Sequence, residues 1–210
     1  MKKKSPKEDK SELRQKIATE AATLLYFGSE KEYKQAKLKA AENFGARILP
    51  SNLEIALELD NIAEVTEGSA RNERLVQMRS DALKIMKILE CYCPVLIGSV
   101  WRGTIRRGSD IDIEVFYDEP QEIIAQLRKT GLEITKMERM DVNENQKPET
   151  SFHIHLFSPC KYPVEIVVRN AEQSGRRRKC DTFGDEIRGL KVQELDNLLQ
   201  INAIQKFLPN

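Results

Sequence analysis

Acidic and apolar residues alternate in the middle of this chain, and the alternation favours a strand with two unlike faces. The stretch reads Asp110, Ile111, Asp112, Ile113, Glu114, Val115. Because successive side chains on a strand point to opposite faces, the three carboxylates would share one face and the apolar side chains would enter a core. Carboxylates this close repel one another, and divalent cations would relieve the repulsion. The alternation therefore indicates a metal site; the simpler alternative is an edge strand with a solvated acidic face.

A short apolar run, residues 95–97, ends in Gly98-Ser99, and ten residues separate Ser99 from Asp110. Glycine lets a backbone approach a ligand closely, and serine adds a hydroxyl, where a strand gives way to a turn or helix. This combination is a usual basis for phosphate binding. A phosphate site close in the chain to a metal site is typical of enzymes that act on nucleoside triphosphates.

The joint pattern of Gly98-Ser99, a ten-residue spacer and Asp110-x-Asp112 resembles the signature of the polymerase-beta-like nucleotidyltransferase superfamily. With Arg102-Gly103 and Gly108-Ser109 inside the spacer, it most resembles the small, minimal members of archaea and bacteria. The resemblance covers about residues 94–170. It implies an α/β fold, a mixed β-sheet packed on helices. It also implies transfer of a nucleoside monophosphate from a triphosphate to a hydroxyl, with release of pyrophosphate.

The resemblance further implies roles for single residues. Asp110 and Asp112 would bind Mg²⁺ or Mn²⁺, two ions in all, and Glu165 would complete the site. Glu165 is the one acid within an apolar run, where a buried carboxylate without a partner would be costly. The superfamily usually has aspartate at this position, so glutamate is a departure. The residues expected to bind the nucleotide are Gly98, Ser99, Arg102 and Ser109; Glu114 is an accessory candidate.

A predicted hairpin adds a histidine to this group. If Phe157 pairs with Pro163 in simple register, His155 lies directly opposite Glu165, with Cβ atoms about 5 Å apart. His153 would lie on the same face. His155 could then orient Glu165, pair with the triphosphate, or move a proton of the acceptor hydroxyl. The alternative is that both histidines are half-exposed strand residues.

Composition limits the kinds of protein that this chain can be. The chain has 210 residues, 40% hydrophobic and 32% charged, with a net charge of +1. This size allows one domain or two small ones, and the near-neutral charge argues against non-specific coating of nucleic acid. No apolar run approaches the ~20 residues that span a bilayer. The basic start lacks the apolar stretch of a signal peptide, so we expect a cytoplasmic protein.

The cysteines do not indicate a zinc site. None of them forms a Cys-x-x-Cys pair, and the sequence has two histidines. We expect all to be reduced and structural, and we expect Cys91 and Cys93, beside a predicted strand, to act as small buried hydrophobes. The four are Cys91, Cys93, Cys160 and Cys180.

The periodicity of apolar residues changes from helical to strand-like along the chain. We expect a disordered basic tail over 1–10, an all-helical region over 11–90, a nucleotidyltransferase core over 91–170, and a basic loop with a C-terminal helix over 171–210. Capping signals at Ser11, Ser29 and Ser51 open helices in the second segment. In the core we expect strands at 95–97, 110–117, 132–142, 152–157 and 164–168, a helix from Pro120, and a polar loop at 143–149. The C-terminal helix is expected near 192–207.

Several alternatives stay open at this stage. The acceptor hydroxyl could belong to an RNA 3′ end, to a protein or to a small molecule, and the basic run 176–179 could contact RNA or remain solvated. The competing class is a non-catalytic nucleotide sensor or interaction module on the same fold. Such proteins generally lose an acid, whereas all three acids are present here, which favours an enzyme. The oligomeric state is not indicated.

Overall fold

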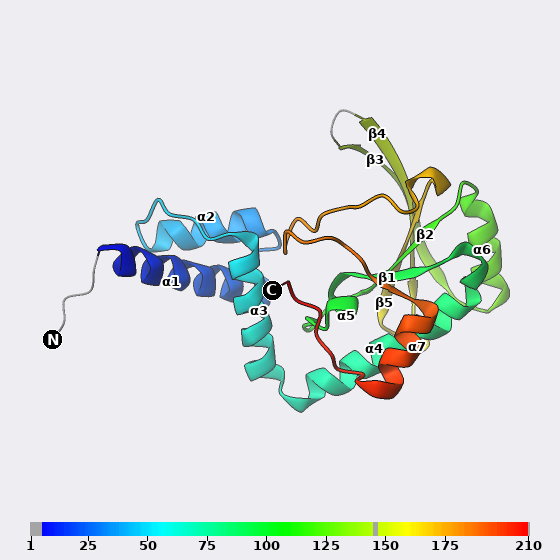
Figure 1. The fold of residues 1–210 in the computed structure, drawn as a ribbon, viewed down its shortest axis with the longest axis horizontal. Coiled ribbons are helices and arrows are strands. Elements are labelled where there is room, and N and C mark those ends of the chain that lie inside the picture. Colours follow the sequence, from blue (N-terminus) through cyan, green and yellow to red (C-terminus); the bar gives the residue numbers. More distant parts are fainter. Residues whose placement is uncertain (1–5, 145–146, 210) are drawn as a thin grey trace. The chain divides into compact units, whose positions relative to one another are not determined.

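An N-terminal helical region precedes a mixed β-sheet packed on helices, as the sequence predicted (Figure 1). The computed structural model describes residues 6–144 and 147–209. By their contacts these residues form two units. One contains residues 6–68, 179–185 and 209; the other contains the sheet with its helices, residues 69–178 and 186–208. The helix over Ser69–Ile88 therefore groups with the sheet, although the sequence assigned it to the helical region.

The helical unit is built from α1 (Pro6–Tyr26), α2 (Tyr33–Asn43) and α3 (Asn52–Glu67). Small apolar residues on α1 and α2 pack closely at its centre, where Ala18, Ala21, Ala36 and Ala40 are fully buried. The predicted capping box opens α3: the Ser51 hydroxyl accepts from the Glu54 backbone N–H at 3.2 Å, and the Glu54 carboxylate accepts from that of Ser51 at 2.7 Å.

Two other helix starts differ from the prediction. Helix α1 begins at Pro6 rather than at Ser11, since proline suits the first turn of a helix. Helix α2 begins at Tyr33 with Glu32 as its N-cap and no side-chain cap, so the box expected at Ser29 does not form. Residues 1–5 of the expected tail lie outside the described residues.

The sheet has the strand order β3-β4-β5-β2-β1-β6. Its strands are β1 (Val95–Ile97), β2 (Ile111–Phe116), β3 (Ile134–Glu144), β4 (Lys147–Phe157), β5 (Pro163–Arg169) and β6 (Leu190–Lys191). Strands β2 and β5 are parallel and the other neighbours are antiparallel. Strands β3 and β4 continue into most of the predicted 143–149 loop, of which residues 145–146 are not described. The two-residue β6 was not predicted.

One face of the sheet packs on helices, and the other carries the acidic residues. The helices are α4 (Ser69–Ile88), α5 (Gly98–Arg102), α6 (Pro120–Lys129) and α7 (Val192–Ile201). Helices α4 and α7 lie side by side (Figure 1). Ile111, Ile113 and Val115 of β2 enter a core with Leu75, Met78 and Ile85 of α4 and Ile123, Ile124 and Leu127 of α6. The alternation of β2 thus buries its apolar face as predicted.

A buried arginine joins α4 to α5 and to the segment after α7. The side chain of Arg79 is fully buried, and burial lowers its pKa to about 10. Its guanidinium donates to the carbonyls of Val100 (3.0 Å), Trp101 (2.8 Å), Ala203 (2.7 Å) and Gln205 (3.0 Å). Since residues 202–207 turn back to meet this group, α7 ends at Ile201 and not near Phe207 as predicted.

Two other buried charges of α4 hold loops of the same unit. Arg71 donates to the Ile105 carbonyl at 2.7 Å. Asp81 accepts from the Ser158 hydroxyl at 2.7 Å and from the Cys160 backbone N–H at 2.9 Å. Burial would raise the pKa of Asp81, but these hydrogen bonds and that of Lys84 outweigh it and lower the pKa. Helix α4 therefore fixes both the segment after β1 and the turn before β5.

The cysteines are free, but the expected burial of Cys91 and Cys93 is wrong. Both are exposed, as is Cys160, while Cys180 is half-buried. The reason is the 3-10 turn Glu90–Tyr92 before β1, which places Tyr92 against Tyr117 and leaves the flanking cysteines outside. Among the described residues, no helix combines the length and apolar character that a membrane span requires.

We predict that Arg79→Met lowers the free energy of unfolding by about 3 kcal/mol or more, because it leaves buried carbonyls without their donor. Urea unfolding measures the change. Lys87→Met is the matched control on the same helix: its ammonium is half-exposed and contacts Asp196 at 3.1 Å. The control substitution should lower the free energy of unfolding by less than about 1 kcal/mol. Equal losses in the two variants would contradict the role given to Arg79.

Candidate active site

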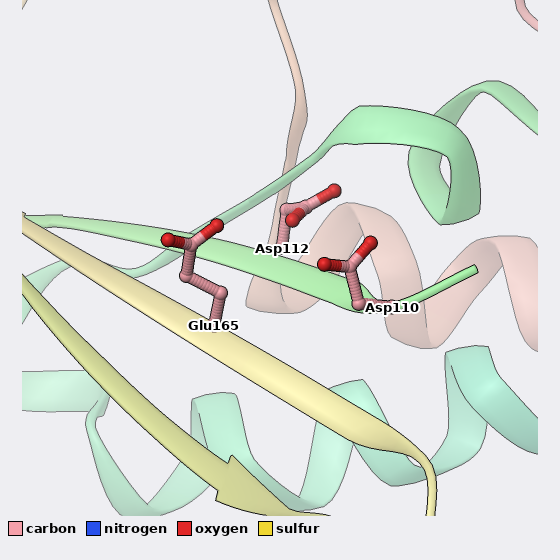
Figure 2. Close-up of side chains that lie close together, drawn as sticks. All are labelled: Asp110, Asp112 and Glu165. Carbon is pink, nitrogen blue, oxygen red and sulfur yellow. The ribbon is translucent and has the colours of Figure 1, made fainter. Parts of the chain in front are cut away.

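Three carboxylates meet where β2 runs parallel to β5. Asp112 of β2 lies directly opposite Glu165 of β5, and Asp110 immediately precedes β2. Each residue offers a carboxylate oxygen within 4.8 Å of those of the other two. Figure 2 shows the three side chains rising from the same face of the strands. The structure therefore brings together the three acids that the sequence selected, although 53 positions separate Glu165 from Asp112.

The electrostatics of this group favour a cation. Burial, together with the negative charges of Asp110 and Glu165, raises the pKa of Asp112 to about 8. Desolvation of its carboxylate by the surrounding protein also raises the pKa of Asp110, although the residue as a whole is exposed, and the charge of Glu165 adds to the rise. A hydrogen bond with its own backbone and the charges of His155 and Arg106 oppose the rise. Carboxylate oxygens are the ligands that Mg²⁺ and Mn²⁺ prefer. The donor set and its convergence fit a divalent ion of this kind.

Gly98 allows the chain to pass directly beside the Asp112 carboxylate. Ile97 pairs with Asp112 across β1 and β2, and Gly98 follows with a φ of +70°. A Cβ at this position would lie 1.9 Å from Asp112 Oδ2. Only glycine meets both the left-handed backbone and the close approach. Gly98 and Ser99 then open α5 next to the acidic group, where the sequence placed a phosphate site.

The Arg102 side chain is not positioned to bind a nucleotide, as the sequence had predicted that it would. Its side chain is buried, with Cζ 4.5 Å from the centre of the Trp101 ring and Nη1 donating to the Phe207 carbonyl at 3.1 Å. The Phe207 backbone N–H returns a hydrogen bond to the Arg102 carbonyl at 2.9 Å. The guanidinium is thus part of the packing of the C-terminal segment, so the predicted contact with a nucleotide is not supported. The sequence could not reveal a partner 105 residues away.

Ser109 lies in a tight turn before the acidic strand. Its hydroxyl accepts from the Arg106 backbone N–H at 2.9 Å, and its own N–H donates to the Arg106 carbonyl at 3.0 Å. The hydroxyl therefore shapes the loop that leads into Asp110. Arg106 is half-buried, and its charge acts on Asp110, so it is the arginine of the motif whose field reaches the acidic group.

Glu114 does not join the three acids. It is 2% exposed, and its carboxylate forms ion pairs with Arg169 at the end of β5 and with Arg178. Among the described residues, the group of acids able to share a metal contains Asp110, Asp112 and Glu165 and not Glu114. The accessory carboxylate expected from the sequence is therefore a buried anchor. The ion pair with Glu114 also shows that Arg178, one arginine of the basic run 176–179, is bound to the sheet.

The predicted hairpin register is confirmed. Phe157 pairs with Pro163, and His155 lies directly opposite Glu165. The closer contact to Glu165 nevertheless comes from His153, whose Nδ1 is 2.6 Å from Glu165 Oε1. His155 Nε2 is 3.9 Å from the same oxygen and 3.1 Å from Glu138 Oε1 on β3. Both histidines are therefore close to the third carboxylate, and the orienting contact belongs to His153.

Clustered carboxylates beside a Gly-Ser turn on a mixed sheet are an arrangement that suits phosphate chemistry assisted by metal ions. Residues 94–182 match the family model described as nucleotidyltransferase domain. This part of the chain is a nucleotidyltransferase domain of the polymerase-beta-like superfamily, as the sequence motif predicted, and it carries a candidate catalytic acidic triad.

A search of curated proteins found no match. A solved structure described as "Structural Basis for the Activity of a Cytoplasmic RNA Terminal U-transferase" is similar, with 18% sequence identity and a TM-score of 0.34. The match covers 57% of this chain and 35% of that one, so the present chain spans about a third of the length of that relative.

We predict that Gly98→Ala weakens Mn²⁺ binding at least tenfold, because the new Cβ displaces the Asp112 carboxylate. Gly108→Ala is the matched control: its φ is +79°, and nothing lies within 4 Å of the added Cβ. Both variants should lose about 1–2 kcal/mol of stability from the left-handed backbone. Isothermal titration with Mn²⁺ separates them, and equal affinities in the two variants would contradict this account of Gly98.

We also predict that Asp112→Asn stabilises the metal-free protein at pH 8. The folded pKa of about 8 exceeds the ordinary value near 3.9, so the folded protein holds this proton more tightly than the unfolded chain. Stability of the unmodified protein should therefore fall as pH rises from about 4 to about 8. In EDTA the variant should melt roughly 3 °C or more higher at pH 8, with a smaller difference at pH 5. Exposed Asp118, changed to Asn, is the control; a lower melting temperature for Asp112→Asn at pH 8 would contradict the prediction.

Proposed function

We propose that this domain transfers a nucleoside monophosphate from a nucleoside triphosphate to a hydroxyl of an RNA or protein acceptor. The observation that carries the proposal is the convergence of Asp110, Asp112 and Glu165 within 4.8 Å, on two parallel strands and beside Gly98. The acceptor oxygen bonds to the α-phosphorus, and the bond to the oxygen that bridges the α- and β-phosphates breaks. Pyrophosphate leaves, and the hydroxyl proton passes to solvent or to a nearby base.

The acidic triad is the proposed site for Mg²⁺ or Mn²⁺, two ions by the resemblance to the superfamily. When bound, these ions would neutralise phosphate charge and lower the pKa of the acceptor hydroxyl. Asp110 is exposed, so its carboxylate can face both solvent and substrate, whereas Asp112 and Glu165 are half-buried and fixed by the strands. The strands thus hold two ligands rigidly and leave the third accessible.

The nucleotide is proposed to bind beside this triad. Gly98 and Ser99 would contact the terminal phosphates, because the backbone there lies against Asp112 with no side chain in between. Ser109 would act indirectly, through the turn that leads to Asp110. Arg106, whose charge opposes the rise in the pKa of Asp110, replaces Arg102 as the arginine proposed to face the triphosphate.

The competing proposal is a nucleotide sensor without turnover. All three acids are present and converge, which supports catalysis, since a sensor has no need of a complete metal site. RNA and protein acceptors are kept together because no described contact favours one of them.

We predict that incubation with α-labelled nucleoside triphosphates, Mg²⁺ or Mn²⁺ and a total RNA and protein extract transfers label to an RNA or protein band and releases pyrophosphate. Asp110→Asn and Asp112→Asn should each lower the rate by at least about 10²–10³-fold, the usual cost of removing one group that stabilises charge in a transition state. Asp118→Asn, an exposed acid outside the triad, should not.

Nucleotide binding without transfer in the unmodified protein would favour the sensor. Transfer that survives in both triad variants would show that the label moves by another site. Label confined to RNA or to protein would name the acceptor class.

A further inference from the structure

A short chain of hydrogen bonds crosses β4 and β5 and ends on the third carboxylate. Ser151 and His153 lie two residues apart on β4, on the face that carries Glu165. The Ser151 hydroxyl is 2.8 Å from His153 Nε2, and His153 Nδ1 is 2.6 Å from Glu165 Oε1. The side chains of His153 and Glu165 are 13% and 25% exposed, and Ser151 is buried. The chain is therefore largely shielded from water.

The chemistry of the three groups assigns each proton. A carboxylate that binds a cation is ionised and only accepts hydrogen bonds, so Nδ1 of His153 would donate to Glu165 when the cation site is formed. In the neutral ring Nε2 then accepts, and the Ser151 hydroxyl is the donor that it faces. Ser151 thus selects the tautomer of His153 that points a proton at Glu165.

This arrangement matters because the third acid is a glutamate. Its side chain has one more rotatable bond than aspartate, so its carboxylate can take more positions relative to Asp110 and Asp112. The hydrogen bond from His153 fixes Oε1 and thereby limits how the carboxylate can turn. Hydrogen bonds to a metal-ligating group typically change metal affinity 10–100-fold.

His155 is placed differently, although it lies directly opposite Glu165. Its Nε2 is 3.1 Å from Glu138 Oε1 but 3.9 Å from Glu165 Oε1, beyond hydrogen-bond distance. Glu138 is itself bound to Lys136 at 2.7 Å. His155 therefore belongs to a pair between β3 and β4 and serves as a matched control for its neighbour.

We propose that His153 is a positioning residue for Glu165. It holds the longer arm of the glutamate through Nδ1, Ser151 fixes its tautomer, and the carboxylate is thereby set to complete the cation site with Asp110 and Asp112. The consequence for catalysis rests on the proposed function, whereas the effect on cation binding does not.

The test is isothermal titration of Mn²⁺ into the full chain. His153→Leu should weaken binding 10–100-fold. His153→Asn should restore most of the affinity, because the asparagine amide can donate from nearly the position of Nδ1. His155→Leu should stay within about threefold of the unmodified protein. Ser151→Ala leaves the ring in place and should weaken binding severalfold, which keeps the test valid if His153→Leu does not fold.

The kinetic readout separates positioning from general damage to the fold. His153→Leu should raise the KM for Mn²⁺ in the transfer reaction, and saturating Mn²⁺ should recover most of the rate. Unchanged Mn²⁺ affinity in both His153→Leu and Ser151→Ala would overturn the inference while leaving the proposed function intact. Loss of Mn²⁺ affinity in these variants, in a protein that transfers no label, would support the inference and overturn the proposed function. Absence of Mn²⁺ binding in the unmodified protein would overturn the inference directly.

Discussion

Repulsion between carboxylates on two parallel strands is the constraint on which the rest of the domain depends. The pairing of β2 with β5 sets Asp112 directly opposite Glu165, and Asp110 adds a third acid. Without a cation, burial and the charges of the other two acids raise the pKa of Asp112 to about 8, far above the ordinary value of an aspartate. The strands that keep these three acids together must therefore be supported by packing on the opposite face of the sheet.

Helix α4 supplies that support through its buried charges. Arg79 and Arg71 bind carbonyls of the segment that follows β1, and Asp81 binds the turn that leads into β5. The two halves of the acidic site are thus attached to one helix on the opposite side of the sheet. Burying these charges is costly unless their hydrogen bonds are satisfied, and here groups of the site loops, with carbonyls of the segment after α7 and Lys84, satisfy them. The stability of α4 and the geometry of the site are therefore linked.

Local patterns in the sequence predicted the acidic strand, and together with the resemblance to the superfamily they predicted its third carboxylate. The alternation from Asp110 to Val115 gave the two faces of β2, and the lone acid of β5 gave the third carboxylate. The position of His155 opposite Glu165 was predicted on the assumption that Phe157 pairs with Pro163, and the structure confirms that register. These features depend on neighbours along the chain or on a strand period of two, which the sequence displays directly.

Contacts between distant residues were not predictable in the same way. Arg102 has the charge expected of a phosphate ligand, but Phe207, at the far end of the chain, takes up its guanidinium. Glu114 has the right period for the acidic face, but Arg169 and Arg178 neutralise it. His155 is directly opposite Glu165, but the side chain of His153 points toward the Glu165 carboxylate and makes the hydrogen bond to it. In each case the residue type suggested a role in the site, but contacts with residues elsewhere in the chain determine what the side chain binds.

Anomalous diffraction from crystals grown with Mn²⁺ and a non-hydrolysable nucleoside triphosphate would test the central claim most directly. The account predicts a manganese peak about 2 Å from carboxylate oxygens of Asp110, Asp112 and Glu165, with the triphosphate beside Gly98. A triphosphate bound at this turn with no manganese between the three acids, or manganese bound only elsewhere, would contradict the assignment of the triad as the metal centre.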